Sequence, residues 1–409
     1  MHTHNNHIKH LFFFISLLLL FSPFTYSQQC LEKPLFDNEP QLTDCPQVNE
    51  TSHIGKSKTK NLSLDNLDTS NGNMIQLLFK CDQNQTTCDK AKIAFNNVIS
   101  IIENTFDLKV PIVINASFVQ LCGTFTTCTP GKPQPLGAAG PARFIPLPDT
   151  DGTQRLFAQS LVKQFQLPQH PAFSNVDITA GFNSESTTFW FRGDPPIGQD
   201  QVDFEIVLAH EFLHGLGFLT SWDEYVNPSN PSAITPSPSF TTDNGGTVTF
   251  NGFQEYSFDK HLVLTKDNSS LTLVTNQLNQ FAKGNPKFAS RKDFIAQFSK
   301  SPEFQIAKGM LTTSVTADSI AFVLPDDGSN VLMETSLSPY APGSSLTHVD
   351  FATLSNTTDF LMRFKAPRQV TLDDLTSING NDPTYTNPIG PKTIRVLQAM
   401  GYVLKNFYS

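Results

Sequence analysis

Two histidines and a glutamate lie close together in an apolar stretch, in the order His210-Glu211-Phe212-Leu213-His214. On a helix, residues four apart share one face, so both imidazoles can direct a nitrogen at one cation. Tetrahedral zinc takes nitrogen ligands of this kind. Glu211 lies beside the metal, where it can take a proton from zinc-bound water and later pass it to a leaving amine. The spacing predicts a hydrolytic Zn2+ centre, with His210 and His214 as ligands and Glu211 as the catalytic base.

The stretch from Val202 to Leu216 is expected to be the helix that carries these residues. It is apolar on most faces, Asp200 or Asp203 can cap its start, and Gly215 and Gly217 end it. A helix this apolar is buried, and a polar side chain within it is costly unless it has a partner. The alternative, two core histidines bonded to backbone and a glutamate that faces solvent, needs a separate partner for each group. The metal centre is therefore the favoured interpretation.

The residues that follow, His214-Gly215-Leu216-Gly217-Phe218, resemble the metzincin group of zinc peptidases. In that group a glycine three residues past the second histidine, here Gly217, lets the chain turn towards a third ligand. The usual place for that ligand is three residues after the glycine, where this chain has Thr220. Threonine is not a zinc ligand, so the short metzincin motif fails and the third ligand must come from elsewhere.

His348 is the leading candidate for the third ligand. Apart from His210 and His214, the histidines outside the first ten residues are His53, His170, His261 and His348. It lies in Ser344-Ser345-Leu346-Thr347-His348-Val349-Asp350, and Asp359-Phe360-Leu361-Met362 follows. This arrangement resembles the leishmanolysin-like branch of the metzincins, and more closely a group of secreted zincin-like proteins that also share an ending like Ala399-Met400-Gly401-Tyr402. The resemblance runs from about residue 110 to residue 403. It implies His348 as third ligand and Met362 as the Met-turn residue beneath the metal.

Several alternatives stay open at this stage. His348 could instead be a surface histidine. Asp350 is a rival ligand, or a second-shell carboxylate that orients an imidazole, and Glu224 is a weaker rival ligand. Met362 could be an ordinary core residue. Met333 competes for the Met-turn role, although it precedes His348, and His261 is taken as structural. Some metzincins have a tyrosine where this chain has Phe364, so no oxyanion stabiliser beyond zinc is assigned.

The elements around the motif predict an α+β fold. Strands are expected at 74–80, 110–119 and 176–182, an amphipathic helix at 88–106, and a Gly/Pro-rich loop at 129–148. The resemblance implies a zincin (metzincin-like) catalytic domain with a mixed twisted sheet and an active-site helix. Because metzincins hold peptides by adding a strand to a sheet edge, the strand at 176–182 is expected to form the upper rim of the cleft.

The expected domain organisation has three parts. Residues 1–27 are a signal peptide, 28–73 an N-terminal extension or pro-segment, and 74–409 the zincin-like metallopeptidase domain. The pro-segment interpretation offers a processing site at Lys56–Lys60. Between the ligand segments, about 220–343 form an insertion that is expected to be largely helical, with helices at 276–284 and 291–309. This insertion is expected to be a lid or subdomain packed on the catalytic unit.

Secretion is predicted from the N-terminus and the cysteines. Lys9 precedes an apolar run from Leu11 to Phe21, which is too short to span a membrane but fits a secretory signal cleaved after Ser27. All six cysteines follow it, and pairing of sequence neighbours gives Cys30–Cys45, Cys81–Cys88 and Cys122–Cys128. Glycosylation acceptors occur at Asn49, Asn61, Asn84, Asn115, Asn268 and Asn356.

These observations lead to one expected function and two alternatives. With 37 acidic against 28 basic residues and a net charge of -9, the composition argues against nucleic acid as a partner. The expected function is a secreted zinc endopeptidase that acts on protein or peptide substrates. The alternatives are a zinc hydrolase of another amide or ester, and an inactive secreted zincin-fold glycoprotein with a structural or adhesive role. The intact Glu211 argues against the inactive protein.

Overall fold

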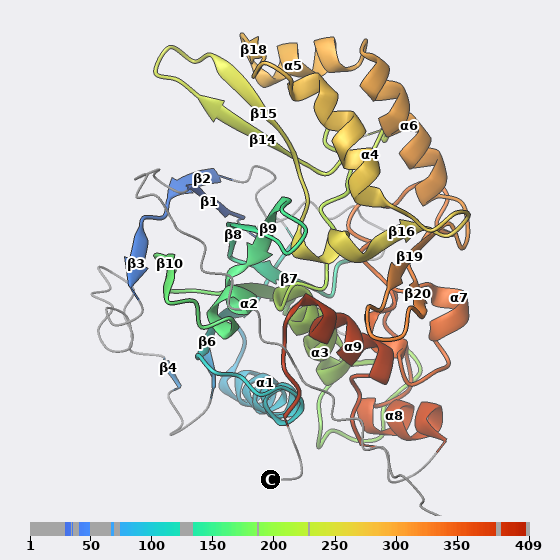
Figure 1. Ribbon diagram of the computed structural model, residues 1–409. Helices are drawn as coiled ribbons and strands as arrows, with labels where there is room; N and C mark the ends of the chain where they lie inside the picture. The colour runs from blue at the N-terminus through green and yellow to red at the C-terminus, as the bar shows by residue number, and fades with distance from the viewer. Residues whose placement is uncertain are drawn as a thin grey trace, which may run out of the picture.

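The computed structural model describes residues 29–33, 35, 41–49, 67–68, 74–122, 134–185, 188–227, 230–381 and 386–405. In Figure 1 a central sheet and the helices α1, α3, α8 and α9 occupy the lower part of the molecule, and α4, α5, α6 and the hairpin β14–β15 rise above them. The expected signal peptide, the Lys56–Lys60 processing site and Asn61 lie outside the described residues. The fold is α+β with several sheets, as predicted.

The central sheet has five strands in the order β4-β5-β6-β11-β7. β5 and β11 run parallel to β6, whereas β4 pairs antiparallel with β5, and β7 antiparallel with β11. The sheet is therefore mixed, and β7 lies at one of its edges. The strands are β4 (Leu67–Asp68), β5 (Ile75–Cys81), β6 (Ile112–Val119), β7 (Gly137–Pro141) and β11 (Ile178–Asn183).

Two long helices pack together beside this sheet. α1 (Gln85–Thr105) begins earlier than predicted because the Asn84 side chain caps it by accepting from Thr87 N at 3.0 Å. α3 (Phe204–Gly215) is the predicted motif helix. The ring of Phe95 on α1 packs against Phe204 and Phe212 on α3 and against β11, with ring centroids 5.5–5.9 Å apart. This aromatic cluster fixes α3 against the sheet.

Two expectations about this region are wrong. The predicted loop at 129–148 contains β7 and β8 (Arg143–Pro148), and β8 pairs with β9 (Gln154–Ala158). The strand at 176–182, now β11, is not a cleft rim, because β6 and β7 cover both of its edges. The open edge belongs to β7. Its Gly-Ala-Ala-Gly-Pro sequence has little strand propensity, so the sequence does not predict a strand there.

The insertion is mixed rather than largely helical. One sheet joins β14 (Ser237–Thr242), β15 (Val248–Gln254) and β18 (Lys287–Phe288); a second joins β17 (Ser269–Ser270), β16 (Leu262–Leu264), β19 (Ile320–Val323) and β20 (Asn330–Leu332). The helix expected at 276–284 starts earlier, as α4 (Leu271–Leu278) and η4 (Asn279–Ala282). The helix expected at 291–309 is two, α5 (Arg291–Phe298) and α6 (Pro302–Ser314), because Ser301 caps a new start at Pro302.

A phenylalanine cluster lies at the centre of the insertion and is continuous with the main hydrophobic core. Rings from β15, η4 and α5 pack at centroid distances of 4.7–6.1 Å, in pairs that join Phe250, Phe253, Phe281, Phe294 and Phe298. Aromatic burial of this kind holds the strands and helices of the insertion together.

The N-terminal extension is packed where it is described. β1 (Gln29–Glu32) pairs with β2 (Gln41–Asp44) and β8, and β3 (Gln47–Asn49) pairs with β10 (Gln169–Pro171). The disulfide Cys30–Cys45 is fully buried, and Cys81–Cys88 also forms as predicted. The third expected pair includes Cys128, which lies outside the described residues. The described residues between 29 and 49 are thus joined to β8 and β10 by strand pairing.

The remaining elements lie around the motif helix and after the insertion. They are α2 (Gln159–Gln164), β12 (Phe189–Trp190), β13 (Val202–Asp203), η3 (Ser257–His261), α7 (Phe351–Leu354), η5 (Phe360–Met362), α8 (Leu372–Gly380) and α9 (Pro391–Met400). Within the described ranges, no helix is both long and apolar enough to cross a membrane.

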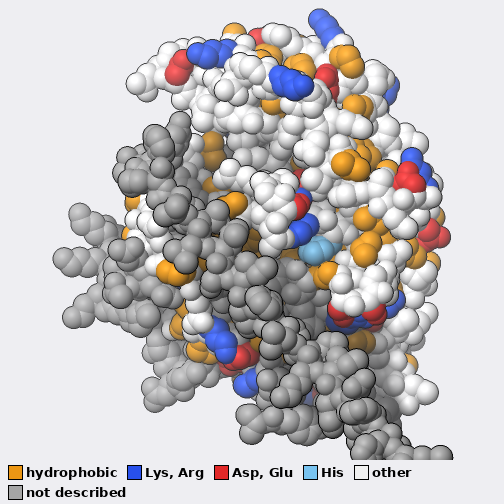
Figure 2. Space-filling model, viewed as in Figure 1, with side chains coloured by type: hydrophobic (Ala, Val, Ile, Leu, Met, Phe, Trp, Pro, Cys, Tyr) orange, Lys and Arg blue, Asp and Glu red, His pale blue; other side chains and the backbone are white. Residues whose placement is uncertain are grey.

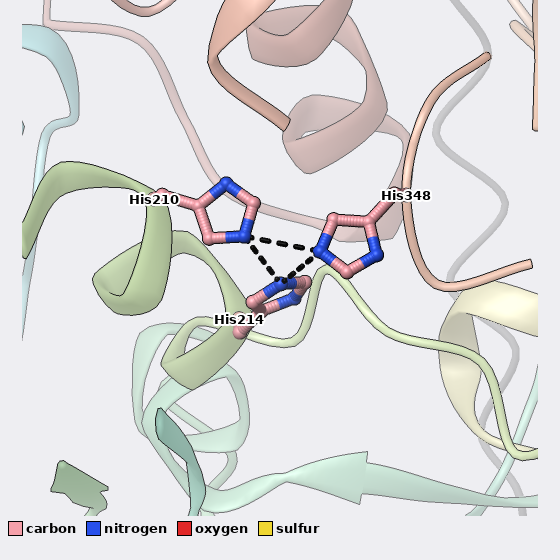
Figure 3. A group of neighbouring side chains, drawn as sticks. All are labelled: His210, His214 and His348. Atoms are coloured by element: carbon pink, nitrogen blue, oxygen red, sulfur yellow. Dashed lines mark hydrogen bonds between the residues drawn. The ribbon is translucent and has the colours of Figure 1, made fainter. Parts of the chain in front are cut away.

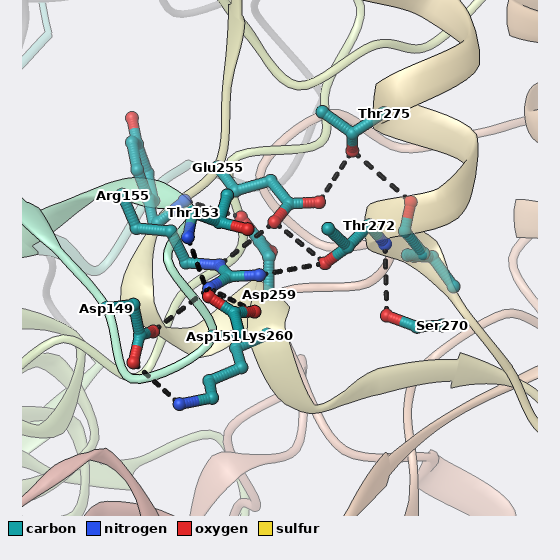
Figure 4. A network of polar contacts seen from close by, with 12 residues as sticks. Asp149, Asp151, Thr153, Arg155, Glu255, Asp259, Lys260, Ser270, Thr272 and Thr275 are labelled. Atoms are coloured by element: carbon teal, nitrogen blue, oxygen red, sulfur yellow. Dashed lines mark hydrogen bonds and ion pairs between the residues drawn. The ribbon is translucent and has the colours of Figure 1, made fainter.

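A buried ion-pair network joins the insertion to the rest of the domain (Figure 4). Arg155 on β9 is fully buried and donates to Glu255 at 3.0 Å, to Asp149 at 3.0 Å and to Asp151 at 2.9 Å. Glu255, also buried, accepts from Thr272 and Thr275 of α4 at 2.9 and 2.6 Å. These partners raise the pKa of Arg155 further, against the effect of its burial. The network fixes where the insertion sits.

Replacement of Arg155 by methionine should therefore lower the free energy of unfolding by about 3–5 kcal/mol, because Glu255 would remain buried and unpaired. Denaturant unfolding monitored by circular dichroism measures this change. Arg395→Gln serves as the matched control, since Arg395 pairs with Asp326 at the surface and its loss should leave stability nearly unchanged. Equal effects of the two substitutions would contradict a structural role for the network.

Candidate metal centre

The motif helix is held at both ends. Asp203 caps its start by accepting from Glu205 N at 2.9 Å. At its end a side chain at Gly215 would approach Ile178 of β11 to 2.4 Å, so only glycine allows this packing. Gly217 then turns the chain with φ +109, and the Tyr402 hydroxyl donates to the Leu216 carbonyl at 3.0 Å. The C-terminal Gly-Tyr pair noted in the sequence thus helps to close the end of α3.

Three histidines meet at the centre of the site (Figure 3). The Nε2 atoms of His210 and His214 lie 3.1 Å apart, those of His210 and His348 3.1 Å, and those of His214 and His348 3.3 Å. Among the residues that the structure describes, these three form the one group of His, Cys, Asp or Glu side chains with metal-binding geometry. The structure therefore brings together the three residues that the sequence analysis assigned as ligands.

The other nitrogen of each ring determines its tautomer. His210 Nδ1 donates to the Leu361 carbonyl at 2.7 Å, His214 Nδ1 to the Phe218 carbonyl at 2.7 Å, and His348 Nδ1 to the Ser344 carbonyl at 2.9 Å. A carbonyl oxygen can only accept, so each neutral ring carries its proton on Nδ1 and a lone pair on Nε2. Three lone pairs that face one another at this distance repel unless a cation lies between them.

The spacing also fits zinc. Zinc–nitrogen bonds of about 2.0–2.1 Å in tetrahedral geometry place the ligand nitrogens about 3.3–3.4 Å apart. The observed separations of 3.1–3.3 Å are close to that value. Backbone carbonyls that hold the far nitrogens are the usual means of orienting histidine ligands. The three imidazoles thus fit a zinc ion with a fourth position left for water or substrate.

Burial keeps the imidazoles neutral. Desolvation lowers the pKa of His210 from its ordinary value near 6.5 to about 4, and that of His348 to about 3. The pKa of His214 also falls well below its ordinary value, first through desolvation and then through the two neighbouring rings. A neutral ring is the form that binds a metal, so the surroundings prepare all three ligands.

Glu211 lies next to the cluster with 8% of its surface exposed. Desolvation raises the pKa of its carboxyl to about 8, while a hydrogen bond with the Ala139 backbone opposes this shift. A nearby cation would lower the pKa and restore the carboxylate. The position of Glu211 between a metal site and the edge strand β7 suits a group that exchanges protons with substrate or water.

Glu334 holds the His348 segment, a role that the sequence analysis missed. Its backbone N–H donates to the His348 carbonyl at 2.8 Å, and its carbonyl accepts from Leu346 N at 2.9 Å. Its fully buried carboxylate accepts from Phe351 N at 3.1 Å. The sequence carries no clear signal for this role, because Glu334 follows only three apolar residues and precedes polar ones.

Met362 lies in a turn whose backbone contacts two of the ligand segments. It is fully buried in η5, its carbonyl accepts from Val349 N at 3.0 Å, and the preceding carbonyl of Leu361 orients His210. The turn therefore supports two ligand segments through its backbone. Met333 is also fully buried and pairs with Val349 from the other side. Both methionine segments thus flank the residue that follows His348.

The rival ligands have other partners. Asp350 caps α7 by accepting from Thr353 N at 2.8 Å and Thr353 Oγ1 at 2.7 Å, so it orients no imidazole; that expectation is corrected. Glu224 accepts from four backbone N–H groups of the 226–233 loop at 2.6–2.9 Å. Thr220 donates to the buried Asp259 of the insertion at 2.5 Å. His261 stacks on Phe322, as a structural residue would.

The metal-site candidate opens into a cavity of about 960 Å3. Its walls include the edge strand β7, the three histidines and Glu211, and the segment from Phe360 to Arg368. The candidate ligands are therefore largely buried but line a cavity. On the face of the molecule that Figure 2 shows, acidic and basic side chains are interspersed among uncharged ones.

The histidine cluster predicts a pH-dependent stability of the metal-free protein. Because the folded-state pKa values are depressed, the unfolded chain takes up protons first, and stability is lost as the pH falls from about 6.5 towards 4. In urea unfolding of chelator-treated protein, His348→Leu should show a shallower loss across this window than the wild type. Saturating zinc should stabilise the wild type but add little to the variant. Parallel pH profiles with the same response to zinc would contradict the assignment.

Comparison with known proteins identifies the family. A family model described as SPBPB7E8-like matches residues 29–409. The protein named uncharacterized protein PB7E8.01 from Schizosaccharomyces pombe is 28% identical over 365 residues, which cover 82% of this chain. The match spans 64% of that relative, so this chain corresponds to less than two thirds of its length. No solved structure matches the chain. With a family match that includes every described residue, the chain belongs to the SPBPB7E8-like family.

Proposed function

We propose that the protein is a zinc-dependent endopeptidase built on a zincin-like, metzincin-type catalytic unit. One observation carries this proposal: the Nε2 lone pairs of His210, His214 and His348 converge to 3.1–3.3 Å beside the buried carboxyl of Glu211. This donor set is the one expected for catalytic zinc with an open fourth position. The mixed sheet, the motif helix and the turn at Met362 agree with a metzincin-type arrangement.

Glu211 is the proposed general acid–base. Its carboxylate takes the proton of the water that attacks the scissile carbonyl carbon, and the protonated carboxyl then passes that proton to the departing amine nitrogen. A bound zinc ion would supply Lewis-acid polarisation of the water and the carbonyl oxygen. Burial raises the pKa of this carboxyl to about 8 without a metal, and a bound cation would lower it towards the carboxylate form that accepts the proton. Phe364, whose ring packs on Phe351 at 5.2 Å, offers no hydrogen-bond donor for the oxyanion.

The edge strand β7 is the proposed binding surface for an extended peptide. Ala142 N donates to Asp177 and Asn183 N to the Leu136 carbonyl, so residues 136 and 142 face β11. By alternation along the strand, Ala139 turns its backbone N–H and carbonyl away from β11 and towards the cavity. The hydrogen bond between Ala139 and Glu211 agrees with this direction. A substrate strand added here would lie directly across the histidines.

Extracellular action is part of the proposal. It rests on the N-terminal signal pattern in the sequence and on the buried disulfide Cys30–Cys45, a bond that persists in oxidising compartments. Among the predicted glycosylation sites, Asn84, Asn115, Asn268 and Asn356 are exposed, as an acceptor must be. Protein or peptide substrates outside the cell would be the partners of such an enzyme.

Glu211→Gln should leave one zinc per chain and reduce peptide hydrolysis by about 10²–10⁴-fold, because the ligands stay while the base is lost. Elemental analysis and cleavage of a mixed fluorogenic peptide library measure the two properties. Glu303→Gln on α6 is the control for the same chemical change away from the cavity. Undiminished hydrolysis by Glu211→Gln, or no hydrolysis by zinc-loaded wild type, would refute the proposed function.

Ala139→Pro should lower kcat/KM for extended peptides about threefold to tenfold, because it removes the outward backbone N–H, which bonds Glu211 in the free protein and is the donor offered to a substrate strand, and removes no bond to β11. Gly140→Ala is the matched control, since it keeps every donor and its new methyl group meets no atom within 4 Å. Thr179→Pro would not test substrate binding, because Thr179 lies inside the sheet. Equal kcat/KM values for Ala139→Pro and the control would rule out strand addition at β7.

A further inference from the structure

Arg363, directly after the Met362 turn, is a buried cation without a carboxylate partner. Its side chain lines the cavity, and 9% of the residue is exposed. Nη1 donates to the Ser355 carbonyl at 3.2 Å, whereas Nη2 is buried and has no hydrogen-bond partner among the described residues. The Phe360 ring lies 6.0 Å from Cζ, at the limit of a cation–π contact. No ion pair of this guanidinium occurs in the described part of the chain.

The other well-buried arginines do not share this feature. Arg143 pairs with Glu32, and Arg155 pairs with Asp149, Asp151 and Glu255. A buried, unpaired charge is costly, and arginine does not escape the cost by losing its proton at neutral pH. Desolvation alone shifts the pKa of Arg363, downwards, so no anion among the described residues compensates its charge. An unpaired cation in a cavity wall is a feature that an anionic ligand would complete.

The surroundings of Arg363 favour an anion. Lys33, Lys365 and Arg368 also line the cavity, and the acidic lining residues besides Glu211 are Asp223 and Glu185. Asp223 already accepts from the Tyr340 hydroxyl at 3.0 Å, and Glu185 is exposed. This basic lining occurs in a chain whose net charge is -9. The charge of Arg363 also acts on His210, whose protonation it disfavours, so the guanidinium is close to the metal-site candidate.

We propose that Arg363 binds a carboxylate of the substrate close to the scissile bond, which makes the enzyme selective for peptides that present an anion there. The proposal rests on the endopeptidase function above and specifies its substrate class. A guanidinium fork binds a carboxylate through two parallel hydrogen bonds, and Nη2 is free to donate one. The carboxylate can come from an acidic side chain or from the free C-terminus of a peptide, and the two sources are separable by experiment.

The test uses zinc-loaded full-length protein and fluorogenic peptides in pairs. In the first set, the two peptides of a pair differ only by Glu or Gln at one position that flanks the cleaved bond. In the second set, one peptide of each pair has a free C-terminus and the other an amidated C-terminus. The wild type should favour one carboxylate by about tenfold to hundredfold in kcat/KM. Arg363→Gln should bring that ratio to about one, and Arg363→Lys should keep part of it. Arg395→Gln, the same change at an arginine outside the cavity, should keep the full ratio.

Zinc content and melting temperature show whether each variant is folded. If Arg363→Gln is not folded, the carboxylate preference of Arg363→Lys is compared with that of the wild type instead. A wild-type ratio near one in every pair, or a ratio that Arg363→Gln and Arg363→Lys leave intact, would overturn the proposal. Fluorescence anisotropy with the Glu211→Gln protein measures binding of the same peptides without turnover. Absence of cleavage by the wild type would refute the endopeptidase. If the Glu211→Gln protein, which keeps Arg363, binds the peptides with and without the carboxylate equally well, the role of Arg363 alone is refuted.

Discussion

The repulsion among three imidazole lone pairs is the constraint on which the site depends. Each Nδ1 is committed to a backbone carbonyl, so the Nε2 atoms face one another without a proton between them. Protonation of an Nε2 atom would relieve the repulsion between the lone pairs, but burial lowers the pKa values of His210 and His348 and so disfavours it. Only rigid support can hold such an arrangement before a cation arrives. That support comes from α3, from the turn at Met362 and from the His348 segment that Glu334 holds at two backbone positions.

The insertion explains how a ligand so distant in sequence reaches the other two. After Gly217 the chain does not continue to a ligand at Thr220; Thr220 and Ser221 bond to the buried Asp259 instead, which directs the chain into the insertion. The Arg155 network and the phenylalanine core then fix that subdomain, so the chain returns with His348 in place. Packing far from the histidines is therefore coupled to metal-site geometry through the position of the insertion.

Much of the local structure could be predicted from the sequence, and the resemblance to metzincins brought His348 to the other two ligands, while the order of the strands could not be predicted. Apolar periodicity located α1 and α3, and the His-x-x-x-His spacing placed two ligands on one helical face. Strand order was not predictable, because the Gly-Ala-Ala-Gly-Pro of β7 lacks strand propensity and only register shows that β11 is interior. The expectation for Asp350 was wrong for a local reason. Because Asp350 lies two residues after His348, its carboxylate was expected to orient an imidazole, but it accepts from the backbone N–H of Thr353 and caps a helix instead.

The central claim is that His210, His214 and His348 hold one zinc ion. Zinc K-edge X-ray absorption of the zinc-loaded wild-type protein tests it most directly, because the technique identifies the atoms bound to the metal. The account predicts three imidazole nitrogens at about 2.0–2.1 Å and one further light atom. A first shell with sulfur at about 2.3 Å, with fewer than three imidazoles, or with oxygen atoms alone would contradict it.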